Sequence, residues 1–432
     1  MINAAPLSIR APRQRQSSPW VAQATRLSRA ATRRSERDSV TELLRPAFTS
    51  PSSLPFRRAS GPTGRAGCPC HPLRRHFLIR RWLLFWSVVL AGWTLPSQAA
   101  EFAFGADLSF LKQAEDHGKV FKDGTNALPG LQLFRQHGYN WIRLRLFVEP
   151  VSNNLPNNLA YTLALAKNAK ALGYKFLLDL HYANSWADPG QQPTPGTWIN
   201  LSHAERVKAV LEYTRDTIAA FRDAGVLPDM VQVGNEVSNG MLWPAGKLPD
   251  HWEQFTDYLR AGIQGVAAGR GTQPSPRIMI HIDQGGNPGR TKYFFDHLQQ
   301  HQIAYDVIGL SYYPWWQGTL MDLRENLAFA AHAYHKDLIV VETAYHWRPE
   351  RETADRAEPF AETPAGQREF LEELTRAVLA VPDNRGQGIF WWEPAVGDRG
   401  GLGSRSFFDD DGNALPVISV FDKYTRPMRR SH

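Results

Sequence analysis

Cysteine is nearly absent from this sequence. Its 432 residues include only two, Cys68 and Cys70, which are separated by a single residue. So few cysteines exclude a domain built on a disulfide framework, and the fold must be stabilised by its hydrophobic core instead. A Cys-x-Cys pair also supplies too few ligands for a structural zinc site. We therefore expect a domain without disulfides and without a zinc site at these cysteines.

Lysine and acidic residues are scarce in the first 100 residues. This segment contains 16 arginines, no lysine and three acids, Glu36, Asp38 and Glu42, and so has a net charge of +13. The whole chain carries +7, so residues 101–432 carry −6. A protein that binds nucleic acid through its folded surface needs an excess of positive charge there. The charge distribution therefore predicts no nucleic-acid partner.

The apolar run at 82–93 is too short for a transmembrane helix, which needs roughly 20 residues. It follows the basic stretch 74–81 and precedes the small residues Ser97, Ala99 and Ala100. Secretory signal peptides have this order of basic flank, short apolar segment and small-residue cleavage site. We therefore predict a signal peptide at 74–99 and a secreted or periplasmic protein, with a membrane anchor as the alternative.

Residues 1–73 are rich in Arg, Ser and Pro and show no sustained apolar period. Such a segment cannot bury enough surface to offset the entropy lost on ordering. We interpret it as a disordered or untranslated leader. The remaining residues, 100–432, are predicted to form one folded domain, because α/β barrels routinely use more than 250 residues as a single domain.

Eight short apolar runs follow one another from residue 102 onward. They span 102–108, 140–147, 175–182, 230–236, 277–283, 307–314, 338–345 and 388–394. The segments between them have helical period, for example 159–173 and 203–225, the latter ending on a glycine. Continuous hydrophobicity favours parallel strands covered on both faces. The pattern predicts a (β/α)8 TIM barrel, with a doubly wound open sheet as the alternative.

Most of these runs end in polar or aromatic residues. In a barrel the carboxyl ends of all strands open onto one face, where catalytic groups gather. Residues spread over almost the whole domain would then meet, which predicts an enzyme. The residues are Asp107, Arg143, Arg145, His181, Glu236, Asp283, Tyr312, Glu342, Trp392 and Glu393.

Two glutamates, Glu236 and Glu342, end the apolar segments 231–236 and 338–342. A single glutamate after a strand is usually a capping or surface residue, but two inside apolar segments at one barrel mouth favour a catalytic pair. Hydrolysis of a glycosidic bond needs one carboxyl group to donate a proton and a second to attack or to activate water. Carboxyl groups ~5 to 5.5 Å apart indicate retention of configuration, and ~6.5 to 9.5 Å indicates inversion.

Polar neighbours fit the same chemistry. The amide of Asn235 could bind a sugar 2-hydroxyl. Arg143 and Arg145 share one face of their strand, so one of them could keep an attacking carboxylate ionised, with a structural salt bridge as the alternative. His181 and Tyr312 are candidate hydrogen-bond partners of a carboxylate or a sugar hydroxyl.

Tryptophans lie beside several strand ends. Aromatic faces stack on the apolar faces of pyranose rings, so a row of them indicates a cleft for a polysaccharide, whereas core packing is the alternative for any one of them. We favour Trp186 as a stacking residue, since it lies in the Gly/Pro-rich loop 183–198. The set is Trp186, Trp198, Trp243, Trp315, Trp316, Trp347, Trp391 and Trp392.

Several long motifs carry a resemblance to a known family. These are 105–115, 142–150, 178–192, 231–246, 310–320, 340–345 and 391–395. Through them the chain, from about 104 to 424, resembles the endo-β-1,4-galactanases of glycoside hydrolase family 53, which are retaining (β/α)8 enzymes of clan A. The resemblance implies that Glu236 is the acid/base and Glu342 the nucleophile. It also implies internal cleavage of β-1,4-galactan, in pectin side chains and type I arabinogalactan.

The resemblance extends to other site residues and to metal binding. It implies a monomer that acts on a polysaccharide, without a cofactor and without stable membrane association. Some bacterial members bind calcium beyond the nucleophile, but segment 346–366 lacks their Asp/His/Asn cluster. Alternatives are another clan A enzyme, such as a mannanase or xylanase, and a catalytically silent sugar-binding barrel. The substrate-binding residues expected are Asp107, Arg143, His181, Trp186, Asn235, Tyr312, Trp347 and Trp392.

Overall fold

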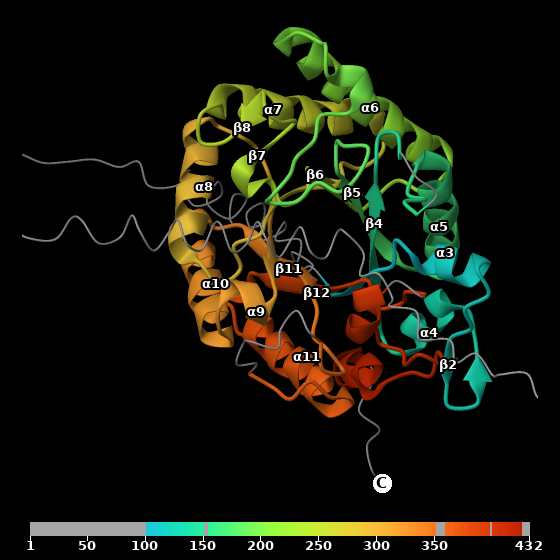
Figure 1. Cartoon of the computed structure of the whole chain (residues 1–432). Coiled ribbons are helices and arrows are strands. Elements are labelled where there is room, and N and C mark those ends of the chain that lie inside the picture. Colours follow the sequence, from blue (N-terminus) through green and yellow to red (C-terminus); the bar gives the residue numbers. More distant parts are fainter. Residues whose placement is uncertain (1–100, 151–153, 351–358, 398–399, 426–432) are drawn as a thin grey trace, which may run out of the picture. The chain divides into compact units, whose positions relative to one another are not determined.

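Eight parallel strands close into a barrel, as the sequence predicts. The strands follow sequence order around the barrel, and β1 closes it by pairing with β12 (Figure 1). This architecture confirms the (β/α)8 prediction and excludes the open sheet. The strands are β1 (Ala103–Asp107), β4 (Trp141–Leu146), β5 (Lys175–Leu180), β6 (Met230–Val233), β9 (Arg277–Ile282), β10 (Val307–Tyr312), β11 (Asp337–Thr343) and β12 (Gly386–Trp392).

The computed structural model describes residues 101–150, 154–350, 359–397 and 400–425. The predicted leader and signal peptide lie outside the described residues, as does 351–358 within the segment considered for calcium. In the part of the chain that is described, no helix combines the length and the apolar character that a bilayer crossing requires.

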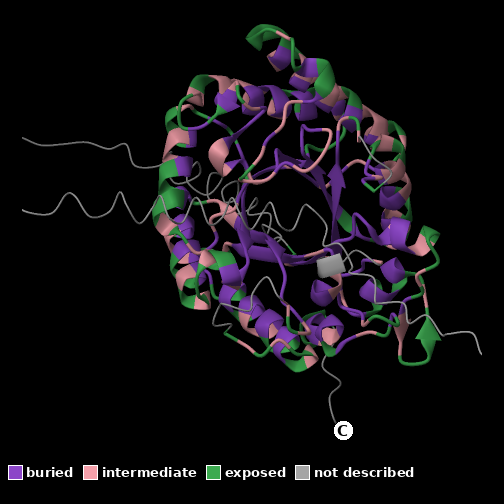
Figure 2. Cartoon of the chain, in the orientation of Figure 1, coloured by how far each residue is buried: buried purple, intermediate pink, exposed green. Residues whose placement is uncertain are grey.

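Helices form a ring around the barrel, with buried residues toward the strands and exposed residues outward (Figure 2). Short elements fill the loops: the hairpins β2–β3 (Lys122–Asp123, Asn126–Ala127) and β7–β8 (Gly240–Met241, Gly246–Lys247), and the helices α9 (Pro314–Gln317) and α12 (Asp422–Thr425). The larger helices are α3 (Leu111–Asp116), α4 (Gly130–Gln136), α5 (Leu159–Ala171), α6 (His203–Asp223), α7 (Trp252–Gly269), α8 (Pro288–Gln300), α10 (Leu320–Tyr334) and α11 (Pro364–Leu379).

Helix α6 shows how local sequence sets element ends. Ser202 accepts a hydrogen bond from the backbone of Glu205, and the Glu205 side chain accepts one from the Ser202 backbone, so both satisfy otherwise unpaired N–H groups. Gly225 follows the helix with φ of +72°, a conformation that suits glycine. The helix predicted at 203–225 is therefore confirmed.

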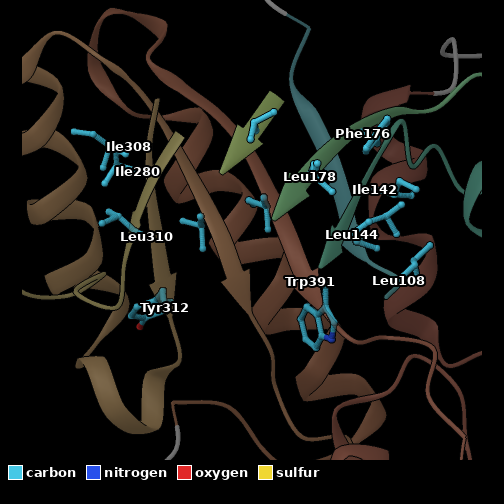
Figure 3. Packing of buried hydrophobic residues seen from close by; sticks show 14 of the residues in the cluster. Leu108, Ile142, Leu144, Phe176, Leu178, Ile280, Ile308, Leu310, Tyr312 and Trp391 are labelled. Carbon is cyan, nitrogen blue, oxygen red and sulfur yellow. The ribbon is translucent and has the colours of Figure 1, made fainter. Parts of the chain in front are cut away.

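Alternation along the strands separates two cores. Outward residues such as Ile142, Leu178 and Leu310 pack between barrel and helices (Figure 3). Inward residues fill the lower barrel, where Gly105 is required because an added Cβ would lie 2.4 Å from the Phe390 ring. The inward apolar cluster is Ala103, Trp141, Leu177, Met230, Met279, Val307, Ile339, Val341 and Phe390.

Above this cluster, the next inward residue on most strands is polar. Strand β4 shows the change: Trp141 lies in the inner cluster, and Arg143 and Arg145, two and four positions later, share its face. The apolar cluster thus forms the floor of a polar layer at the carboxyl ends of the strands. That layer includes Asp107, Arg143, Asp179, Gln232, His281, Ser311 and Glu342.

Candidate active site

Arg143 lies at the centre of the polar layer and is fully buried. Its guanidinium contacts three carboxylates from three other strands: Asp107 at 2.8 Å, Asp179 at 2.9 Å and Glu342 at 2.7 Å. Each ion pair compensates for charge taken out of water, and the planar guanidinium can serve several oxygens at once. The cluster therefore fixes Glu342 relative to the barrel wall.

Glu342 is directed into the barrel by an irregularity in β11. The pairing with β10 shifts by one residue, so that Val340 pairs with Leu310 but Glu342 pairs with Ser311. Bulges of this kind re-aim side chains next to active sites. Glu342 also accepts a hydrogen bond from the Tyr313 hydroxyl at 3.3 Å. Burial raises the pKa of Glu342 to about 7, while the charge of Arg143 opposes this rise.

Glu236 follows β6 in the left-handed backbone region, with φ of +45°. Non-glycine residues rarely adopt this conformation, and it occurs often at functional sites. Its Oε1 lies 2.6 Å from the Ser311 hydroxyl. Burial and the negative charge of Glu342 raise the pKa of Glu236 well above the usual carboxyl range. Because Arg143 contacts only Glu342 of the two, Glu342 ionises first and Glu236 keeps its proton.

Asn235 connects the two sides of the site. Its amide oxygen accepts from Arg143 at 2.7 Å and from Gln232 at 3.0 Å. The amide nitrogen donates to the carbonyl of Ala187 at 2.9 Å and carries a second hydrogen. These contacts fix the orientation of the Asn235 amide at the position that precedes Glu236.

Aromatic side chains lie at or after the carboxyl ends of strands β5, β11 and β12. The rings of Trp186 and Trp392 lie 6.2 Å apart, and both are partly exposed. Arg145, which is paired with Glu393, has its guanidinium 4.5 Å from the centre of the Trp186 ring and so packs against that ring. Trp347 is likewise partly exposed and donates its indole N–H to the Gly403 carbonyl at 2.9 Å.

Tyr312 differs from its expected placement. Its side chain lies in the outer hydrophobic layer, and its hydroxyl donates to the Gly318 carbonyl at 3.0 Å (Figure 3). Alternation along β10 turns Ser311 and Tyr313 inward and Tyr312 outward. The tyrosine that contacts a catalytic-pair candidate is therefore Tyr313, and this corrects the choice made from the sequence.

His181 lies in the site, but both ring nitrogens bond within the protein. Nε2 contacts Asp179 at 3.0 Å, and Nδ1 accepts from the backbone of Ala187 at 3.3 Å. The imidazole thus ties the loop that carries Trp186 to the Arg143 cluster. Its contact with a sugar stays a prediction.

Sequence reasoning missed five inward-facing residues of the site: Asp179, Gln232, His281, Ser311 and Tyr313. Period-two counting from the apolar floor would have found the first four. Each follows an inner-cluster residue at an even spacing, as His281 follows Met279. Tyr313 continues the same count on β10 beyond the last strand residue.

Two carboxyl groups in different protonation states can divide the work of acid and nucleophile. Glu342, held by a guanidinium, loses its proton first, and Glu236 retains its proton to higher pH, which is the order that hydrolysis of a glycoside requires. Within the described residues, no group of three or more His, Cys, Asp or Glu is arranged to hold a metal ion.

The profile of the family described as glycosyl hydrolase family 53 matches residues 103–421. The chain belongs to this family. A probable arabinogalactan endo-β-1,4-galactanase A from Aspergillus terreus is 36% identical over 326 residues, 72% of this chain and 90% of the relative. A family 53 member is a glycoside hydrolase, so the enzyme predicted from the strand ends is confirmed. The family needs no cofactor for this chemistry.

Solved structures of family 53 share the barrel. A fungal β-1,4-galactanase is similar with a TM-score of 0.68 and 30% identity, over 74% of this chain and 99% of that chain. The family 53 catalytic domain of an Ignisphaera aggregans protein is similar with a TM-score of 0.69 and 31% identity, over 76% of this chain and 97% of that chain.

Proposed function

We propose that this family 53 hydrolase cleaves internal β-1,4-galactosidic bonds in galactan and type I arabinogalactan, with Glu236 as acid/base and Glu342 as nucleophile. One observation carries the assignment of roles: Arg143 contacts Glu342 at 2.7 Å, whereas Glu236 is bonded to the neutral Ser311 hydroxyl. The substrate is supported by the galactanases among its relatives.

The reaction proceeds in two steps with retention of configuration. The Glu342 carboxylate attacks the anomeric carbon while Glu236 gives its proton to the leaving glycosidic oxygen, so the glycosidic bond breaks as a glycosyl ester forms. Glu236, now ionised, takes a proton from a water molecule that attacks the anomeric carbon, so the bond from that carbon to Glu342 breaks and the Glu342 carboxylate is released. Tyr313 donates to Glu342 and orients it for attack.

The remaining polar and aromatic residues of the mouth bind the sugar chain. Asn235 donates to the 2-hydroxyl of the reacting galactose, and the Trp186 and Trp392 rings stack on apolar sugar faces. The full set of contacts we propose is Asp107, Arg143, His181, Trp186, Asn235, Trp347 and Trp392.

The enzyme acts outside the cytoplasm as a monomer, in the degradation of pectin side chains. The signal peptide predicted at 74–99 supports export, and the polymeric substrate is too large to enter a cell. Sequencing the mature exported protein is expected to give a start at Ala100 or Glu101. A start at Met1 in a cell-attached form would favour a membrane anchor instead.

The substrate is tested by reducing-sugar release from β-1,4-galactan, mannan, xylan and cellulose. We expect release from galactan, with internal cleavage products of several sizes. Glu236→Gln and Glu342→Gln are each expected to lower turnover by about 10³-fold or more, with unchanged circular dichroism. Preference for mannan or xylan would assign a different clan A activity. Near-normal turnover of either variant would remove that residue from the catalytic pair.

A further inference from the structure

A chain of hydrogen bonds connects the two carboxylates beneath the barrel mouth. The Ser311 hydroxyl lies 2.6 Å from Glu236 Oε1 and 2.9 Å from His281 Nε2. On the other side of the imidazole, Nδ1 lies 3.1 Å from Asn235 Oδ1, and this oxygen accepts from Arg143, the partner of Glu342. Ser311 and His281 are fully buried, so their proton positions are decided within the protein.

The amide of Asn235 decides which imidazole nitrogen carries the proton. Its nitrogen donates to Ala187 and its oxygen accepts from Arg143, so the oxygen is the atom that faces His281. An amide oxygen only accepts, and the 3.1 Å contact is therefore attractive when Nδ1 is protonated. The Glu236 backbone N–H favours the other tautomer, but at 3.4 Å it is at the limit of hydrogen-bond distance.

The second nitrogen, Nε2, is then an acceptor. Burial lowers the pKa of His281 well below its ordinary value, so the ring is neutral and has one proton. When Glu236 carries a proton, it can donate that proton to the Ser311 oxygen, and the single hydroxyl proton of Ser311 can then point to Nε2. When Glu236 is protonated, the Glu236 carboxyl, the Ser311 hydroxyl and His281 Nε2 each have a hydrogen-bond partner. An ionised Glu236 competes with Nε2 for the one hydroxyl proton, and one contact is lost.

We propose that Ser311 and His281 are positioning residues that hold the acid proton on Glu236 in the resting enzyme. The proposal rests on the proposed role of Glu236 as the acid. When the proton of Glu236 passes to the glycosidic oxygen, the Ser311 hydroxyl turns from Nε2 to the new carboxylate, and Nε2 loses its partner. This chain of hydrogen bonds from Glu236 through Ser311 and His281 to Asn235, here called the relay, therefore opposes ionisation of Glu236 before substrate is bound.

Other charged groups surround the relay from several elements. They act on Glu236 and His281 as well, and the variants below leave them in place, so a change in the pH profile reports the relay. Glu236 is faced by Glu342 on β11, Asp283 after β9 and Asp188 after β5, and His281 is faced by Arg143 on β4 and by Asp179 and His181 of β5 and its end.

The tautomer of His281 tests the proposal without any substrate. The full chain is labelled with ¹⁵N-histidine, and two-bond ¹H–¹⁵N correlations are recorded, with the His281 signals assigned by their loss in His281→Asn. We expect the Nδ1–H tautomer in the resting enzyme. Glu236→Gln is expected to keep it at every pH, because the Gln amide still donates to Ser311. An Nε2–H tautomer in the resting wild-type enzyme would overturn the proposal.

The pH profile of kcat/KM on galactan tests its effect on catalysis. His281→Asn leaves the Ser311 hydroxyl free to donate to an ionised Glu236, so the alkaline limb is expected to move to lower pH by about one unit. In a Ser311→Ala variant, adding His281→Asn is expected to cause no further movement of the alkaline limb. His137→Asn, at a buried histidine that contacts Asp123 and Asp422, is the matched control and leaves the limb unchanged.

The outcomes separate this proposal from the proposed function. An alkaline limb unmoved in His281→Asn, or moved equally with and without Ser311, would contradict the relay. If galactan is not cleaved, the proposed function fails, while the His281 tautomer still decides the relay. If His281→Asn does not fold, the wild-type tautomer, assigned through Glu236→Gln and Ser311→Ala, remains a complete test.

Discussion

At the scale of single residues, the site gives two identical carboxylic acids different properties. Glu342 lies on Arg143, whose charge favours the ionised form, whereas Glu236 lies on a hydroxyl and faces the charge of Glu342. Environment therefore separates the proton donor from the attacking group, and the sequence motif alone could not. The motif supplied the two glutamates, but the identity of the charge partner required the strand register.

Removal of the guanidinium at Arg143 tests this separation. Arg143→Lys cannot serve Asp107, Asp179 and Glu342 together, so the pKa of Glu342 is expected to rise further. Since the nucleophile must be ionised, the acid limb of kcat/KM moves to higher pH. The free energy of unfolding is expected to fall by up to about 3–5 kcal/mol. Arg206→Lys is the control, because Arg206 contacts backbone carbonyls and, within the part of the chain that the structure describes, no carboxylate. An unchanged acid limb in Arg143→Lys would contradict the role of Arg143 in keeping Glu342 ionised.

At the scale of elements, the apolar runs predicted all eight strands, because parallel barrel strands are buried on both faces. The short hairpins escaped prediction, since two-residue strands leave no periodic signal. The same limit explains Tyr312: the run 307–314 fixed the strand, whereas the inward face had to be counted from the apolar floor. The bulge in β11 likewise has no local sequence signal, yet it directs Glu342 into the site.

The loop after β5 contributes Trp186 to the mouth. Trp186→Ala removes a stacking surface worth about 0.5–1.5 kcal/mol, so KM for galactan is expected to rise roughly 2- to 12-fold with kcat nearly unchanged. Steady-state kinetics measure the two constants separately. Tyr293→Ala, an exposed aromatic on α8, is the control and leaves KM unchanged. A fall in kcat alone would assign Trp186 to the support of the catalytic residues instead.

Helices α6 and α7 pack closely because glycine removes side-chain volume between them. A Cβ at Gly265 would lie 2.6 Å from Thr214 Cβ and 2.7 Å from the Leu211 carbonyl oxygen. Gly265→Ala is therefore expected to lower the free energy of unfolding by about 1–3 kcal/mol, measured by urea denaturation. The exposed Gln264→Ala on the same helix is expected to change it by less than about 0.5 kcal/mol. A stabilised Gly265→Ala would show that the helices can separate without cost.

At the scale of the whole molecule, the barrel concentrates buried carboxylates at one end, and this arrangement costs stability. The pKa of Glu236 in the folded protein lies above its unfolded value of about 4.3. The stability that the protonated Glu236 side chain contributes to the free energy of unfolding is therefore fully present below that pH, and it is lost as pH rises through the folded pKa. Glu236→Gln does not titrate. Its Tm is therefore expected to exceed the wild-type Tm at pH 8, with a smaller difference at pH 4. An equal difference at both pH values would contradict the raised pKa.

The central claim is the division of roles between Glu236 and Glu342, and azide rescue tests it most directly. An activated aryl β-galactoside of suitable chain length is incubated with Glu236→Ala or Glu342→Ala and sodium azide, and the anomeric configuration of the glycosyl azide is read by ¹H NMR. The account predicts a β-azide from Glu236→Ala, because Glu342 still forms the ester that azide then opens. It predicts an α-azide from Glu342→Ala, where azide replaces the nucleophile. The reverse assignment of products would contradict it.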